Sequence, residues 1–147
     1  MNTPHEQIHA TAVAIDGRGV LILGPSGAGK SDLALRLIDE GAILIADDRV
    51  DLTPDGGGVL LSGPDNLAGL LEVRGVGIVR LTYETKVSLS LVVDLVKPEA
   101  VERLPDRLSA DFMGAPVRRI ALDPFQASAP AKIRLALRAA DGDMLQT

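Results

Sequence analysis

The sequence has no cysteine, no tryptophan and very few aromatic residues. One Tyr and two Phe occur among 147 residues, so aromatic side chains make up only 2%. The missing cysteines exclude disulfides and thiolate metal sites, and they fit a reducing compartment. A core must therefore be built from aliphatic side chains. The hydrophobic fraction of 46% is enough for a packed globule, and we expect one domain over residues 1–147.

An excess of basic residues is also missing, as is any long apolar run. The 15 Lys and Arg residues are outnumbered by 20 Asp and Glu, which gives a net charge of −5. This balance argues against a nucleic-acid partner. No segment reaches the ~18 consecutive apolar residues of a membrane span. The N-terminal residues lack the basic start and apolar run of a secretion signal. We therefore expect a cytoplasmic protein without a membrane span.

The strongest motif present is a phosphate-binding loop that matches the pattern G-x-x-x-x-G-K-[ST]. An apolar run, 20–23, precedes it, and apolar residues at helical spacing follow it up to a capping glycine, Gly41. Its glycines let backbone N–H groups close around phosphate oxygens, and the helix dipole adds to the attraction. We expect Lys30 to bind the β- and γ-phosphates and Ser31 to bind Mg²⁺. The loop consists of Gly24, Pro25, Ser26, Gly27, Ala28, Gly29, Lys30 and Ser31.

The rest of the chain is richer in strand patterns than in helix patterns. A hairpin is expected in which residues 11–15 pair with 20–23 and 17–19 form the turn. Short β-like runs follow at 42–46, 49–53, 59–62, 78–82 and 88–95. Further helices are expected near 98–104 and over 130–140. Regular βαβ alternation is absent, so we expect an α/β fold with a mixed, strongly curved sheet and few helices.

Three other features are candidates for chemistry, and each has a simpler interpretation. Asp47 and Asp48 end an apolar strand, where a carboxylate can approach a metal ion or accept a proton, or can belong to a solvated turn. The segment 72–78 contains two glycines between Glu, Arg and apolar residues, and it also fits a surface β-turn. His9 precedes the first strand and is either near the loop or simply on the surface.

Together these motifs resemble the catalytic domain of the HPr kinase/phosphorylase family, bacterial enzymes that phosphorylate a serine of the phosphocarrier protein HPr. The resemblance covers residues 9 to about 80 in order and spacing. It is carried by 9–12, 24–31, 45–50 and 71–78, the last of which resembles the family's own signature. A weaker match is Glu102-Arg103-Leu104.

The resemblance implies a role for each matching residue. Lys30 would hold phosphate, while Ser31 and Glu72 would bind Mg²⁺. The Asp47–Asp48 pair would supply the proton acceptor, without an assignment between the two. His9 and Arg103 match positions that are counted as catalytic in the family. The fold implied is a P-loop core related to that of phosphoenolpyruvate carboxykinase.

Two departures from the family pattern stand out. The family's regulatory N-terminal domain is not found before residue 9, as in the short forms of alphaproteobacteria. The arginine-rich stretch that longer members use for dephosphorylation is replaced by residues 120–130. This replacement argues against the reverse, phosphorylase reaction. The long members are hexamers, so the resemblance also allows a homo-oligomer.

The expected function is therefore ATP-dependent phosphorylation of a serine of HPr or a related carrier, with ATP and Mg²⁺ as cofactors. Two alternatives remain at this point. The chain is a nucleotide-sensing regulatory module with little turnover, or it is a P-loop kinase of a small molecule.

Overall fold

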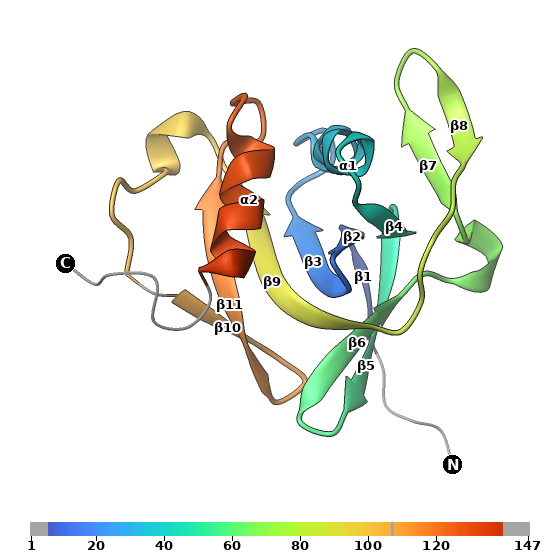
Figure 1. The fold of residues 1–147 in the computed structure, drawn as a ribbon, viewed down its shortest axis with the longest axis horizontal. Helices are drawn as coiled ribbons and strands as arrows, with labels where there is room; N and C mark the ends of the chain where they lie inside the picture. Colours follow the sequence, from blue (N-terminus) through green and yellow to red (C-terminus); the bar gives the residue numbers. More distant parts are fainter. Residues whose placement is uncertain (1–5, 107, 140–147) are drawn as a thin grey trace.

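The computed structural model describes residues 6–106 and 108–139, and Figure 1 shows its fold. Within these residues a curved sheet carries two α-helices, α1 (Lys30–Asp39) and α2 (Ala129–Arg138), and two short 3₁₀ turns, η1 (Asp65–Leu67) and η2 (Pro98–Ala100). The strands are β1 (Glu6–His9), β2 (Thr11–Ile15), β3 (Arg18–Leu23), β4 (Ile43–Ala46), β5 (Arg49–Asp55), β6 (Gly58–Ser62), β7 (Leu70–Val73), β8 (Gly77–Arg80), β9 (Val87–Leu95), β10 (Leu108–Phe112) and β11 (Ala115–Leu122).

The main sheet is mixed, and β9 lies at its centre. The strand order is β1-β5-β6-β9-β3-β2-β4, with β11 also paired to β9 and β10 paired to β11. β9 runs parallel to β3 and to β11, whereas β2 runs antiparallel to both β3 and β4. The carboxyl ends of β4, β3, β9 and β11 therefore meet at one edge of the sheet. In α/β sheets such an edge is the usual place for a ligand.

The two faces of the sheet are buried in different ways. Alternate side chains of β2 and β3 contribute to two separate clusters, as the two-residue period of a strand requires. Val13 and Ile22 belong to a cluster that the helices cover, and Leu21 belongs to a second cluster with residues of β5 and β6. Figure 1 shows β5 and β6 in the lower part of the view, where β9 curls to meet β6, while α1 and α2 lie in the upper part. Both clusters consist of aliphatic side chains, and Phe112 packs against the second one.

The end of α1 and the start of α2 carry the capping residues that the sequence predicts. α1 stops in a Schellman motif, in which Gly41 (φ 113°) donates its N–H to the carbonyl of Ile38 and Ala42 donates to that of Leu37. Pro130 stands in the first turn of α2, where its missing N–H leaves no hydrogen bond unmade. The firm end of α1 fixes the helix whose other end carries the phosphate-binding loop.

Most of the predicted elements are confirmed, and three corrections are needed. The helix expected over 98–104 is wrong, because only the turn η2 forms there. The first hairpin turns at Asp16 and Gly17, both with positive φ, so that Arg18 already belongs to β3. The sequence patterns did not predict the strands β1, β7, β10 and β11. The helix expected over 130–140 is confirmed as α2, although residue 140 lies outside the described residues.

Candidate active site

The phosphate-binding loop connects β3 to α1 at the carboxyl edge of the sheet. Gly29 caps the helix with a φ of 100°, a conformation that an L side chain rarely adopts. Gly24 starts the loop where space is short, since a Cβ atom there would lie 3.1 Å from that of Ala28 and 3.2 Å from that of Leu95. The strand, loop and helix therefore have the arrangement that the motif predicts.

Lys30 lies across the loop that it belongs to. Its ammonium donates hydrogen bonds to the carbonyl oxygens of Gly24, at 2.7 Å, and of Pro25, at 3.1 Å. These bonds hold the charge over the concave side of the loop. Because an ammonium has three donors on a flexible stem, it can exchange carbonyl oxygens for phosphate oxygens with a small movement.

Asp47 links the loop to the neighbouring strands through its carboxylate. The residue follows β4 and is only 9% exposed. Its Oδ1 accepts a hydrogen bond of 2.8 Å from the Ser31 hydroxyl and one of 2.9 Å from the Thr11 hydroxyl. Its Oδ2 lies 3.4 Å from the backbone nitrogen of Glu72, a long contact. The carboxylate thus joins residues of β2, α1 and β7.

Asp48 has the opposite character. The N–H of Arg49 bonds to the carbonyl oxygen of Asp47 at 2.9 Å, which makes Asp48 the central residue of a γ-turn with φ 73°. This strained conformation turns the Asp48 side chain to solvent, and 68% of it is exposed. The imidazole of His9 lies 3.7 Å away, between Nδ1 and the Asp48 Oδ1. Strain of this kind is frequent at functional sites.

Glu72 lies on the β7–β8 hairpin, beside the site. The two strands pair antiparallel from Leu70 to Arg80, and the turn uses Gly75 and Gly77 with positive φ. The backbone of Glu72 is the part that reaches Asp47. Figure 1 shows the hairpin projecting from the molecule next to α1 and β4. Beyond Glu72, the hairpin exposes two apolar side chains, Val76 and Ile78.

Comparison with known proteins identifies the family. The model of the family described as the HPr serine kinase C-terminal domain matches residues 2–126. The chain belongs to this family. Among curated relatives, the HPr kinase/phosphorylase of Bordetella pertussis is 40% identical over 131 residues, and that of Clostridium tetani is 37% identical over 132. Each alignment covers 81% of this chain, but 42% and 43% of the respective relative.

A solved structure supports the same assignment at the level of the fold. The Hpr(Ser) kinase/phosphatase from Coxiella burnetii superposes with a TM-score of 0.79 and is 30% identical in sequence. The match covers 90% of this chain and 94% of the other. The mixed curled sheet with few helices, expected from the strand-rich middle of the sequence, is therefore confirmed as the fold of an HPr kinase domain.

The residues of this HPr kinase domain fit a magnesium ion that is bound together with a nucleotide. The described residues contain no group of three His, Cys, Asp or Glu side chains that could hold a metal by themselves. They do bring a serine hydroxyl and a carboxylate within 2.8 Å of each other beside the loop. Magnesium at phosphotransfer sites takes one or two such protein ligands and completes its shell with phosphate oxygens and water. Ser31 and Asp47 fit this pattern, and the role of Glu72 as a Mg²⁺ ligand stays a prediction from the family resemblance.

Arg103 is not brought to the other candidate residues. It is exposed in the segment after η2, and it has no hydrogen bond to another described residue. Figure 1 shows η2 on the side of α2 and β11, whereas β4, the strand that Asp47 follows, lies on the other side of α1. A catalytic role for Arg103 stays a prediction from the family resemblance.

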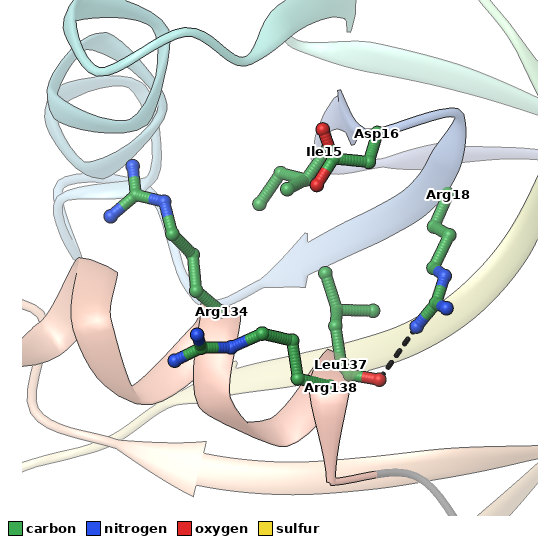
Figure 2. Close-up of a pocket in the computed structure, with 6 residues that line it drawn as sticks. All are labelled: Ile15, Asp16, Arg18, Arg134, Leu137 and Arg138. Carbon is green, nitrogen blue, oxygen red and sulfur yellow. Dashed lines mark hydrogen bonds between the residues drawn. The ribbon is translucent and has the colours of Figure 1, made fainter.

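A hollow of about 330 Å³ lies away from this site, as Figure 2 shows. It is found at the turn between β2 and β3, the opposite end of β3 from the phosphate loop. Arg18 donates to the carbonyl of Leu137 there, and Arg134 forms an ion pair of 2.6 Å with Glu40 of α1. The second terminal nitrogen of Arg134 is buried and without a partner among the described residues. That nitrogen is inaccessible from the hollow, so it offers no donor to a ligand there.

Two residues of the site were not identified from the sequence. Thr11 lies in the matching segment 9–12 but has no predicted role, although it is the sole polar side chain of the fully buried strand β2. Phe125 follows β11, and its ring lies against the phosphate loop: a Cβ atom at Gly29 would be 3.3 Å from two of its ring carbons. The signal in the sequence that could have identified Phe125 is the scarcity of aromatic residues, since the chain has only three.

Proposed function

We propose that this chain is the catalytic domain of an ATP-dependent kinase that phosphorylates a serine of the phosphocarrier protein HPr. The observation that carries the proposal is the pair of unlike carboxylates beside the phosphate loop. Asp47 is buried and bonded to Ser31, while Asp48 is exposed and lies beside His9. A kinase needs both a group that orients the phosphate end of the nucleotide and a group that accepts the proton of the acceptor hydroxyl.

The environment of each carboxylate suggests its role. Both described hydrogen bonds to Asp47 Oδ1 come from hydroxyl groups, which leaves Asp47 a positioning role for Ser31 and a bound magnesium. Asp48 is open to a protein partner, so it is the residue that we assign as proton acceptor. His9 Nδ1 faces Asp48 Oδ1 and would orient that carboxylate. The sequence left this choice between Asp47 and Asp48 open, and the assignment is a proposal from their different environments.

The chemical step then balances as an in-line transfer. The serine oxygen of HPr attacks the γ-phosphorus, the bond from that phosphorus to the β,γ-bridging oxygen breaks, and ADP leaves. The serine proton passes to the carboxylate of Asp48. Lys30 and the loop amides would stabilise the charge on the transferred group, and bound magnesium would neutralise further charge on the phosphate oxygens.

The same residues bear on the alternatives. A nucleotide sensor has no need of an exposed carboxylate held in a strained turn, and a protein acceptor suits a carboxylate that is open rather than enclosed. We propose the forward reaction only, because residues 120–130 form the end of β11, a turn and the start of α2 in place of an arginine-rich stretch. No described helix is long and apolar enough to cross a membrane. We propose the cytoplasm as the compartment and leave a homo-oligomer to be measured by light scattering.

The test is transfer of label from γ-labelled ATP to HPr with Mg²⁺, followed by phosphoamino-acid analysis. We expect phosphoserine with the unchanged chain and a loss of about 10²- to 10⁴-fold in kcat for Asp48→Asn, because a general base contributes about that much. ATP binding, measured by calorimetry, should be unchanged in that variant. An HPr variant with alanine at the acceptor serine is the matched control. Intact ATP binding with label on no serine of HPr would refute the proposal.

A further inference from the structure

Phe125 presents an aromatic ring to solvent directly beside the phosphate loop. The residue is 71% exposed, yet its ring lies against Gly29, the residue that caps α1. The other two aromatic residues of the chain are Phe112 in β10 and Tyr83, whose ring lies beside Gly69. The flat apolar face next to the loop is therefore supplied by this one side chain.

The turn that carries Phe125 is held in place on both sides. The carboxylate of Asp123, itself only 6% exposed, accepts a hydrogen bond of 3.0 Å from the N–H of Phe125 and so forms an Asx-turn. Arg36 of α1 donates to the carbonyl oxygen of Pro124 and, at 3.5 Å, to that of Gln126. The helix that begins at the phosphate loop thus also fixes the turn. The ring is exposed, but the backbone beneath it is restrained.

The strand order places Phe125 and the two aspartates, Asp47 and Asp48, on opposite sides of the loop. Asp47 follows β4, which is separated from β3 by β2, whereas Phe125 follows β11, which is separated from β3 by β9. A nucleotide with its γ-phosphate toward Asp47 and Asp48 therefore extends its other end toward β9 and β11. On that side of the loop lies the exposed ring of Phe125, next to Gly29.

We propose that Phe125 is the stacking platform for the base of the bound nucleotide. An aromatic ring gains most from a flat partner that covers its face, and the base is the only flat, largely apolar part of ATP. The inference rests on the proposed function, because it takes the loop to hold the phosphates of ATP. It adds a residue that contacts the substrate at the end away from the transferred phosphoryl group.

The test compares ATP with tripolyphosphate, which has the phosphate chain without base or ribose. Calorimetry with Mg²⁺ measures both affinities for the unchanged chain and for Phe125→Ala. Stacking on one aromatic ring contributes on the order of tenfold in affinity or more. We therefore expect Phe125→Ala to bind ATP about tenfold more weakly and tripolyphosphate unchanged. Leu135→Ala, which shortens an exposed apolar side chain of α2, should change neither affinity.

A second variant gives a direct readout. The chain has no Trp, so Phe125→Trp places a single tryptophan at the platform. We expect it to keep the affinity for ATP and to lose fluorescence when ATP binds, but not when tripolyphosphate binds. Equal ATP affinity of Phe125→Ala and the unchanged chain would overturn the inference, as would an equal loss for both ligands. Neither measurement uses HPr. If the ring of Phe125 stacks on the base of ATP but no phosphate is transferred to HPr, only the proposed function is refuted.

Discussion

Replacing Asp47 with alanine should destabilise the fold as well as stop the reaction. The Thr11 hydroxyl is 1% exposed and donates to Asp47 Oδ1, so the variant leaves a buried donor without its acceptor. A hydrogen bond to a charged group contributes about 1.5–3 kcal/mol, and a buried polar group left unpaired costs about 1–3 kcal/mol. Ser31 is less buried and can turn to water, so Thr11 dominates. We expect a loss of about 2–3 kcal/mol in the free energy of unfolding.

Thermal and urea unfolding followed by circular dichroism measure this loss. For a chain of this size, each kcal/mol corresponds to about 2–4 °C, so Tm should fall by about 5–10 °C. Thr11→Val keeps the shape of the side chain and removes the donor. The double variant, Asp47→Ala with Thr11→Val, should lose at least ~1 kcal/mol less free energy of unfolding than the sum of the two single variants, since contacting residues couple by about 0.5–3 kcal/mol. An unchanged Tm for Asp47→Ala, or strict additivity, would refute the reasoning.

Two further predictions concern backbone conformation at the site. Asp48→Gly should raise the free energy of unfolding by about 1 kcal/mol in urea titrations, because the left-handed φ of 73° strains a non-glycine residue. The same variant should lose transfer to HPr. A lower free energy of unfolding would contradict the assigned strain. Gly29→Ala should weaken ATP binding in calorimetry at least as much as Phe125→Ala does, since its Cβ would lie 3.3 Å from the ring of Phe125. Gly17→Ala is the matched control, because Gly17 has a φ of 77° and open space around it. This variant should lose about 1–2 kcal/mol in the free energy of unfolding and keep its affinity for ATP. Similar ATP affinities of the two variants would argue against the close fit at Gly29.

Local patterns predicted the elements around the phosphate loop well. The apolar run before the loop, the helical spacing after it and Gly41 at the end are short-range signals, and β3, α1 and the Schellman motif follow them. The hairpin of β2 and β3 was found for the same reason. The structure brings together residues from all four motif segments between residues 9 and 78, because Asp47 contacts Thr11, Ser31 and the backbone of Glu72.

The missed elements depend on partners that are distant in sequence. β11 contains Arg118 and Arg119, which hide its apolar pattern, and its place next to β9 is stabilised by the bidentate pair between Arg119 and Asp94. The hydrogen bond from Arg119 to Asp94 raises the pKa of the Arg119 guanidinium. The segment 98–104 shows the opposite error, because a helix is predicted there and does not form. Pro98 marks a helix start, but only a 3₁₀ turn follows.

The unequal roles of the two aspartates could not be read from the sequence either. Adjacent carboxylates look alike in a motif, and only the γ-turn buries one and exposes the other. The contacts of Phe125 with the loop were hidden for a related reason. They join residues almost 100 positions apart, which a local pattern does not connect.

The central place of β9 has a consequence for how the chain folds during synthesis. β3 leads into the phosphate loop, but its parallel partner β9 lies about 70 residues further along the chain. A nascent chain that has just emerged through residue 78 already contains every motif segment from His9 to Ile78, yet one edge of β3 has no strand to pair with. Contacts this distant slow folding and leave apolar edges open to aggregation while they wait. Translation must therefore pass beyond residue 95 before the residues that handle phosphate acquire a stable scaffold.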